Sequence, residues 1–222
     1  EVLVDQPTEY EKLFQLNTIV LTDHPIPKEM PIYLFTETPD NQASVLMKGR
    51  DILRCNFSFC KGTHPDPILI IDNQGGSEPG YPGAQVWRDE LQKLEVKDGS
   101  IMLIPFTEPL LHTLSEAFAV VQFVQQKGWS NLIIVAPPFH ALRCFLSTVT
   151  AIRHLKADVR VYNEVGFALS WYTEVTHSQK IVRGRRIDLV VSELRRIKRY
   201  QRANRLLRLV TDGVLFLLHA VR

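Results

Sequence analysis

His140 and Arg143 are the two side chains in this sequence whose chemistry and spacing best fit a functional site. They lie three residues apart, so a helix would place them on one face. The imidazole of His140 can give or take a proton near neutral pH, and the guanidinium of Arg143 can neutralise a phosphate or a carboxylate. We therefore treat both as candidate catalytic residues of a site for an anionic ligand. The alternative is structural: a histidine at a helix start and an arginine in solvent.

The elements around this pair are predicted from short apolar runs that are rich in β-branched residues. Such runs are typical of strands buried on both faces. They occur at residues 32–36, 68–72, 101–105, 132–136 and 159–162. Between them, the spacing of apolar residues predicts helices at 42–53, around 86–94, at 113–127 and at 138–155. This alternation predicts a three-layer, Rossmann-like α/β fold, with a mostly parallel sheet of about five or six strands and helices on both faces.

Polar residues and glycines stand at the ends of two other predicted strands. Thr36 and Glu37 end the first strand, and Asp72, Gly75 and Gly76 follow the second. Because the carboxyl ends of parallel strands share one edge of the sheet, we expect these ligand-binding candidates beside the histidine and the arginine. Glycine lets the backbone approach a ligand closely, and an aspartate can meet a ribose hydroxyl or a metal. A plain turn at the glycines and a loop-capping role for Asp72 are the structural alternatives.

The start of the predicted helix at 113–127 adds three ligand-binding candidates: Thr113, Ser115 and Glu116. A helix N-terminus favours an anionic group, because its first N–H groups have no partner within the helix. Thr113 and Glu116 also have the spacing of a capping box, in which each side chain bonds a backbone N–H. Both roles are compatible with the sequence.

Three of these segments together resemble the YdcF/SanA/ElyC-like family of Rossmann-like proteins. The resemblance covers about residues 68–145 and is carried by three matches. Residues 72–76 match a Ser-Gly-Gly-like turn, residues 112–117 match an Asn-Thr-x-Glu-Asn-Ala-like helix start, and residues 135–143 match a Val-Thr-Ser-x-Tyr-His-x-x-Arg segment. The resemblance implies a pocket for a nucleotide-like molecule, with S-adenosylmethionine as the candidate for one branch of the family. Other branches are linked to envelope biogenesis.

A strongly basic segment spans residues 180–208, where lysines and arginines far outnumber Asp188 and Glu193. An apolar stripe accompanies the charges: Leu189, Leu194, Ile197, Leu206, Leu207 and Val210. We predict an amphipathic basic helix whose stripe docks on the domain. Peripheral contact with an anionic membrane surface is the alternative. Nucleic acid is not the expected partner, because Tyr200 is the one aromatic residue among these charges. Shorter elements are predicted as a helix at 10–16, a strand at 18–21 and a short helix within 165–176.

Composition describes an ordinary globular protein of 222 residues, 45% of them hydrophobic, with a net charge of +2. One domain is expected, with its core at about 30–165 and a C-terminal helical extension at about 166–222. Three cysteines are few for a secreted disulfide scaffold, so we expect a soluble, cytoplasmic protein. An envelope location is the alternative if an N-terminal anchor has been removed. Cys55, Cys60 and His64 offer three ligands at an unusual spacing, whereas structural zinc uses four, so no metal site is predicted.

The sequence therefore predicts a protein that binds a small anionic or nucleotide-like ligand, and that acts by group transfer or hydrolysis if it is an enzyme. The alternative is a non-catalytic envelope or membrane-surface factor that contacts anionic partners through its basic helix. The chain has no Gly-x-Gly-x-x-Gly fingerprint, no P-loop lysine and no Gly-x-Ser-x-Gly elbow. A standard dinucleotide site, a P-loop and an α/β-hydrolase triad are therefore not supported.

Overall fold

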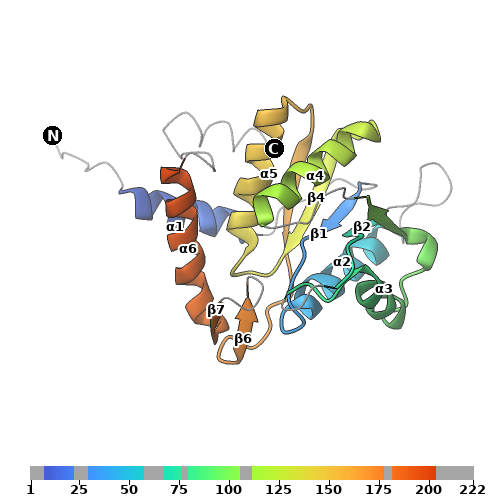
Figure 1. Ribbon diagram of the computed structural model, residues 1–222, viewed down its shortest axis with the longest axis horizontal. Helices are drawn as coiled ribbons and strands as arrows, with labels where there is room; N and C mark the ends of the chain where they lie inside the picture. Colours follow the sequence, from blue (N-terminus) through green and yellow to red (C-terminus); the bar gives the residue numbers. More distant parts are fainter. Residues whose placement is uncertain are drawn as a thin grey trace.

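A five-stranded parallel sheet forms the centre of the molecule (Figure 1). The computed structural model describes residues 8–22, 30–57, 68–76, 80–105, 112–177 and 182–203. The strands are β1 (Ile32–Leu34), β2 (Leu69–Asp72), β3 (Ile101–Ile104), β4 (Asn131–Ala136) and β5 (Arg160–Val165). They lie in the order β3-β2-β1-β4-β5, and every pair is parallel. The five predicted strands and the Rossmann-like α/β class are confirmed.

Helices cover both faces of the sheet. They are α1 (Glu9–Val20), α2 (Gln42–Phe57), α3 (Ala84–Lys93), α4 (Thr113–Gln126), α5 (Ala141–Leu155) and α6 (Arg186–Arg202), with a short 3₁₀ turn at Asp98–Ser100. Side chains alternate between the faces along each strand. Tyr33 packs in one core with α1, α4 and α5, whereas Ile32 and Leu34 pack in a second core with α2 and α3. All three are fully buried, which explains why the central strand is apolar at every position.

The first helix is longer than its sequence pattern predicts. The predicted strand at 18–21 is wrong, because α1 continues through these residues to Val20. Thr8 caps its N-terminus in a capping box with Glu11. Leu13, Leu16 and Val20 are buried at helical spacing in the core shared with α4 and α5. This burial outweighs the preference of the β-branched residues for a strand.

The chain after β5 forms an antiparallel hairpin and then α6. The strands of the hairpin are β6 (Glu174–His177) and β7 (Val182–Arg185). The predicted short helix within 165–176 is wrong, because the backbone there is bonded to other elements. The N–H of Gly166 donates to the carbonyl of Ala136 at 2.8 Å, and the N–H of Phe167 donates to that of Ser44 at 3.0 Å. These bonds hold the chain across the carboxyl edge of the sheet.

The predicted basic helix is present as α6, which starts at Arg186 rather than at 180. Its buried face includes Leu189, Glu193 and Ile197, spaced by four residues. Ile197 belongs to the core that α1, α4 and α5 share. The part of the prediction beyond residue 203 lies outside the described residues. Among the helices that the structure describes, none combines the length and the apolar character that a bilayer crossing requires.

Candidate functional site

The candidate site lies where the strand order reverses. β1 and β4 are neighbours in the sheet, but the chain leaves β1 toward α2 on one face and leaves β4 toward α5 on the other. Such a reversal opens a crevice at the carboxyl ends of the strands, where open α/β sheets bind their ligands. Glu37 follows β1 and His140 follows β4, and their side chains meet at this point. The expected convergence of these two strand ends is confirmed.

Two prolines shape the connection from β4 to α5. The carbonyl of Pro137 accepts hydrogen bonds from the N–H groups of His140, at 2.8 Å, and Ala141, at 2.9 Å. This turn delays the helix, which starts at Ala141 instead of near the predicted Pro138. His140 becomes the N-cap residue and Arg143 lies in the first turn. Both side chains are thereby held at the carboxyl edge of the sheet.

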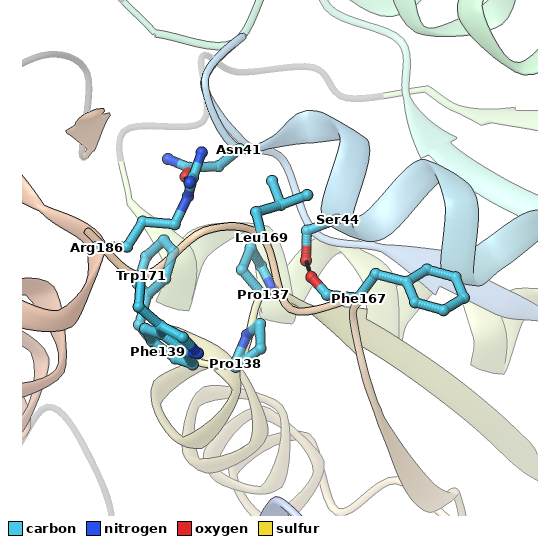
Figure 2. Close-up of a pocket in the computed structure, with 9 residues that line it drawn as sticks. All are labelled: Asn41, Ser44, Pro137, Pro138, Phe139, Phe167, Leu169, Trp171 and Arg186. Atoms are coloured by element: carbon cyan, nitrogen blue, oxygen red, sulfur yellow. Dashed lines mark hydrogen bonds between the residues drawn. The ribbon is translucent and has the colours of Figure 1, made fainter. Parts of the chain in front are cut away.

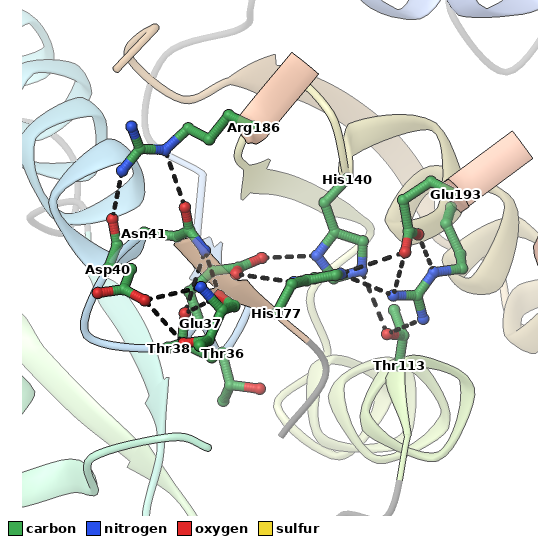
Figure 3. Close-up of polar contacts among 12 residues, drawn as sticks. Thr36, Glu37, Thr38, Asp40, Asn41, Thr113, His140, His177, Arg186 and Glu193 are labelled. Atoms are coloured by element: carbon green, nitrogen blue, oxygen red, sulfur yellow. Dashed lines mark hydrogen bonds and ion pairs between the residues drawn. The ribbon is translucent and has the colours of Figure 1, made fainter. Parts of the chain in front are cut away.

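A buried carboxylate joins two histidines at the centre of the site (Figure 3). Oε1 of Glu37 lies 2.6 Å from Nδ1 of His140, and Oε2 lies 3.5 Å from Nδ1 of His177. The side chains of these three residues are 1%, 3% and 4% exposed, respectively. On its other side, the ring of His140 places Nε2 at 3.3 Å from the hydroxyl of Thr113. The three ligand-type residues belong to different segments, and their donor atoms converge within 4.8 Å.

Arg143 is enclosed by protein groups. Its Nε and Nη2 atoms contact the two carboxylate oxygens of Glu193 from α6, and Nη1 donates to the hydroxyl of Thr113 at 2.5 Å. The same glutamate lies 3.2 Å from Nε2 of His177. The guanidinium is buried, with a side chain 5% exposed, and its charge is met by Glu193. An external anion that reached Arg143 would therefore compete with an internal carboxylate.

The protonation states follow from burial and from these contacts. Burial alone would raise the pKa of Glu37, but His140 and His177 lower it to about 2, so the carboxylate is charged. Burial lowers the pKa of His140 to about 4, with a further contribution from Arg143, and its ring is neutral at pH 7. Burial alone would lower the pKa of His177, but contacts with the carboxylates of Glu193 and Glu37 raise it. The two histidines thus differ in their affinity for a proton, although they lie side by side.

A second buried carboxyl group, that of Glu116, lies near the ends of β1 and β2. Oε1 accepts hydrogen bonds from the hydroxyl of Tyr33 and from the N–H of Thr36, each at 2.8 Å, and Oε2 lies 3.1 Å from the hydroxyl of Thr36. Burial raises the pKa of Glu116 to about 8, and the nearby Asp72 adds to this effect. Burial also raises the pKa of Asp72 to about 6. The carboxyl edge of the sheet thus holds two carboxyl groups with raised pKa values, those of Glu116 and Asp72.

The glycine turn after β2 is built by contacts within the chain. Gly75 forms an antiparallel bridge with Gly83, and a Cβ atom on Gly76 would lie 2.5 Å from the carbonyl oxygen of Pro82. Oδ1 of Asp72 accepts a hydrogen bond from the N–H of Gln74 at 2.7 Å. These are the turn and loop-capping roles that the sequence left open. Both glycines are nevertheless exposed, so their backbone also faces solvent.

The start of α4 differs from the predicted capping box. The box is formed one residue earlier, by His112 as N-cap and Ser115 as the third helical residue. The side chain of Ser115 is thus used by the helix end, where it accepts from the N–H of His112 at 3.3 Å. Thr113 and Glu116 are released from capping, because the helix starts at Thr113 itself. Their side chains instead turn inward, that of Thr113 to Arg143 and that of Glu116 to Tyr33 of β1.

Two central residues of the site, His177 and Glu193, were not among the sequence candidates. His177 is the last residue of β6, in a segment that resembled no catalytic motif. Glu193 carried a detectable signal, because it lies midway between the buried Leu189 and Ile197 at a spacing of four. An acid inside the apolar stripe of a basic helix predicts a buried partner of opposite charge. That partner, Arg143, is 50 residues away in the sequence, so the pairing itself is a tertiary feature.

A shallow recess with a cavity volume of about 10 Å³, room for about one water molecule, lies beside Phe139 (Figure 2). Its walls include Pro137, Phe139, Trp171 and Arg186. The ring of Phe139 separates the recess from His177, with 5.0 Å between the ring centroids. The guanidinium of Arg186 donates to neutral acceptors: Oδ1 of Asn41 at 3.0 Å and the carbonyls of Asp40 and Ser170 at 2.6 and 2.7 Å. This recess places a cation and aromatic rings next to the site.

Comparison of the chain with family models, curated proteins and solved structures finds no match in any of the three. The residues themselves therefore carry the functional argument. The structure brings Glu37, Thr113, His140 and Arg143 into one cluster, and places Thr36 and Glu116 in a second. Asp72 lies close to this second cluster, whereas Gly75, Gly76 and Ser115 line the edge outside both.

Proposed function

We propose that this protein binds a small anionic, nucleotide-like ligand at the carboxyl edge of its sheet and acts on it by group transfer or hydrolysis. The observation that carries the proposal is the meeting of Glu37 and His140 at the reversal of strand order, 2.6 Å apart. Open α/β sheets bind ligands at this position. The resemblance of residues 68–145 to YdcF-like proteins supports the same class of ligand, with S-adenosylmethionine as the first candidate.

Several groups at this edge suit an anion. The N-terminus of α4 lies beside the site, because the side chain of Thr113 contacts both His140 and Arg143. A helix N-terminus attracts negative charge through its first N–H groups and through the helix dipole. The exposed backbone of Gly75 and Gly76 offers close approach for a phosphate or a carboxylate. In this proposal Arg143 shapes the site while it remains paired with Glu193.

His140 is the group that would hold or move a proton. Glu37 fixes the ring through Nδ1, and Nε2 faces the hydroxyl of Thr113. Arg143 donates to that hydroxyl, so the hydroxyl proton is directed away from the guanidinium and toward the imidazole. A carboxylate, a histidine and a hydroxyl in sequence are the elements of general acid–base and nucleophilic catalysis.

The first test is a thermal-shift screen of the full chain against S-adenosylmethionine, nucleotides and sugar phosphates, in a buffer with a metal chelator. A ligand at a hundred times its Kd should stabilise the protein by about 2.7 kcal/mol. Calorimetry then compares wild type with His140→Gln and with His154→Gln. Both histidines are in or next to α5, but His154 is exposed in the last turn of the helix.

We expect His140→Gln to weaken binding by about tenfold or more, a loss of about 1.4 kcal/mol, and His154→Gln to leave it unchanged. Equal affinity in both variants would refute the site. A screen without any hit would contradict the proposed ligand class and favour the second candidate function.

That second candidate is contact with an anionic membrane surface through α6. Three arginines of this helix, Arg195, Arg199 and Arg202, are exposed. The same side of the helix exposes the apolar residues Ile187 and Val191, which are 42% and 50% accessible. Basic and apolar residues that are exposed together favour adsorption to anionic lipid. Arg196 does not belong to this surface, because it turns toward Glu193 at 3.7 Å.

A further inference from the structure

The geometry points to a metal site: Glu37, His140 and His177 bind one divalent transition-metal ion, such as Zn²⁺ or Fe²⁺. Imidazole nitrogen and carboxylate oxygen are the ligands that these ions prefer, and two histidines with one carboxylate form a recurrent set. The three donor atoms lie within 4.8 Å of one another, and all three side chains are buried. The inference does not depend on the proposed organic ligand.

Within the described residues, two atoms of this set make no hydrogen bond of ordinary geometry. They are Oε2 of Glu37 and Nδ1 of His177, both fully enclosed by protein. Buried polar atoms are nearly always satisfied, so a pair of orphans that face each other requires an explanation. Their separation is 3.5 Å. Two ligands of a tetrahedral ion with bonds of about 2.1 Å lie about 3.4 Å apart, so a cation between these atoms would satisfy both.

The outer groups orient the rings in the way that metal sites require. Nε2 of His177 lies 3.2 Å from a carboxylate oxygen of Glu193, and Nε2 of His140 lies 3.3 Å from the hydroxyl of Thr113. A metal-binding histidine commonly gives its other ring N–H to such an acceptor, which leaves the inner nitrogen free for the ion. Arg143 holds both acceptors in place. Both Nδ1 atoms are thus aimed at Glu37.

One ligand has to move when the ion enters. Nδ1 of His140 lies 2.6 Å from Oε1 of Glu37, which is closer than two ligands of one ion. The ring must withdraw by less than about 1 Å, and its proton must pass from Nδ1 to Nε2, next to the hydroxyl of Thr113. In the metal-bound form His140 serves as a ligand, and its proposed role in proton transfer belongs to the metal-free form. Three protein ligands also leave a coordination position for water or for a substrate oxygen.

The rival occupant of the same space is a proton. A doubly protonated His177 would donate one N–H to Glu37 and the other to Glu193, and would also satisfy the orphan atoms. The two occupants are distinguished by metal stoichiometry and by spectroscopy, because a proton gives neither bound metal nor a ligand-field spectrum.

The test uses the full chain, produced without a polyhistidine tag, stripped with a chelator and dialysed against Zn²⁺ or Co²⁺. We expect one equivalent of Zn²⁺ by elemental analysis and visible Co²⁺ bands typical of nitrogen and oxygen ligands. Absence of stoichiometric metal in the wild-type protein would overturn the proposal without any variant.

Variants then locate the ion. His177→Gln and Glu37→Gln should weaken Zn²⁺ binding by about a hundredfold or more, because each removes a direct ligand, whereas removal of an outer partner costs ten- to a hundredfold. His154→Gln is the matched control and should retain one equivalent. A Cys55→Ser, Cys60→Ser, His64→Gln variant tests the other ligand group in the sequence. Loss of the ion there, with retention in His177→Gln, would contradict the assignment. The variants are compared only after circular dichroism shows that they fold.

Discussion

The charged groups of the site are buried together and compensate one another. Glu37 and Glu193 are ionised below the surface because histidines and Arg143 contact their oxygens. Removing water from a charge is costly unless a partner replaces it, and loss of one partner leaves the other uncompensated. Replacement of any one charged member of this network is therefore expected to destabilise the fold. It also limits substitutions at Arg143, because loss of the guanidinium would leave the buried carboxylate of Glu193 without its cationic partner.

The pH dependence of stability is expected to contain a contribution from Glu116. Its pKa is about 8 in the folded protein and 4.5 ordinarily, so the folded state binds the proton more tightly. This contribution is complete below a pH of about 4.5 and is lost as the pH rises through about 8, with a total on the order of a few kcal/mol. The groups that face Glu116 are Tyr33, Thr36 and Asp72.

Glu116→Gln isolates this contribution, because glutamine has the shape and hydrogen-bonding capacity of the protonated acid. Chemical unfolding between a pH of about 5 and about 8 should show the wild type losing stability relative to the variant. The difference is the quantity to measure, since Asp72, with a pKa of about 6, titrates in the same range. A difference that stays constant with pH would show that Glu116 has an ordinary pKa.

At the scale of elements, the carboxyl edge is closed by tight backbone contacts. The segment after β5 crosses the ends of α2 and β4 at Gly166, with hydrogen bonds from its backbone and from Phe167. The hydroxyl of Ser44 donates to the carbonyl of Phe167 at 2.7 Å, which fixes the crossing. This crossing directs the chain into β6 and so places His177 over the site.

Gly166→Ala should disturb this crossing. A Cβ atom at this position would lie 2.5 Å from the hydroxyl of Ser44 and 2.9 Å from its carbonyl oxygen, so the segments must separate. We expect a loss of about 1 to 3 kcal/mol, the usual cost of overpacking. Gly99→Ala is the control, because nothing lies within 4 Å of its added Cβ. Thermal unfolding of both variants decides the question, and equal melting temperatures would disprove the close contact.

At the scale of the whole molecule, the C-terminal segment completes the site. The sheet and its flanking helices supply Glu37, Thr113, His140 and Arg143, whereas β6 and α6 supply His177 and Glu193. α6 also has an exposed basic side, so one helix has two distinct faces. The inner face fixes the position of the helix through Leu189 and Ile197.

The exposed basic side of α6 leads to a prediction about lipid binding. If the second candidate function holds, the protein should sediment with phosphatidylserine-containing vesicles at low salt and be released at high salt, because screening weakens the attraction. Glutamine at Arg195, Arg199 and Arg202 should abolish this binding. The same change at Arg153, Lys156 and Arg160, which are exposed on another part of the molecule, is the charge-matched control. Equal binding of both variants would rule out α6 as the contact.

The sequence alone was sufficient for the sheet and for part of the site. The apolar runs predicted all five strands of the central sheet. The pattern is clearest in β1 and in residues 132–136 of β4, where burial on both faces leaves an unbroken hydrophobic run. Parallel strands share a carboxyl edge, so the sequence predicts that Glu37, Thr113 and His140 lie close together. The same local reasoning misplaced the capping box of α4 and the segment at 165–176, where hydrogen bonds to distant residues decide the conformation.

The tertiary structure decided which charges the site contains and how they are paired. His177 and Glu193 follow His140 by 37 and 53 residues in the sequence, yet both belong to the cluster of contacts around His140. No local pattern specifies that β6 returns over the carboxyl edge or that α6 turns Glu193 toward Arg143. Packing of α6 on the core determines which side chains face inward. Because Leu189 and Ile197 are buried on one face of the helix, Glu193, which lies between them on that face, is buried as well. Local sequence thus determined the elements, and long-range burial determined the chemistry at their common edge.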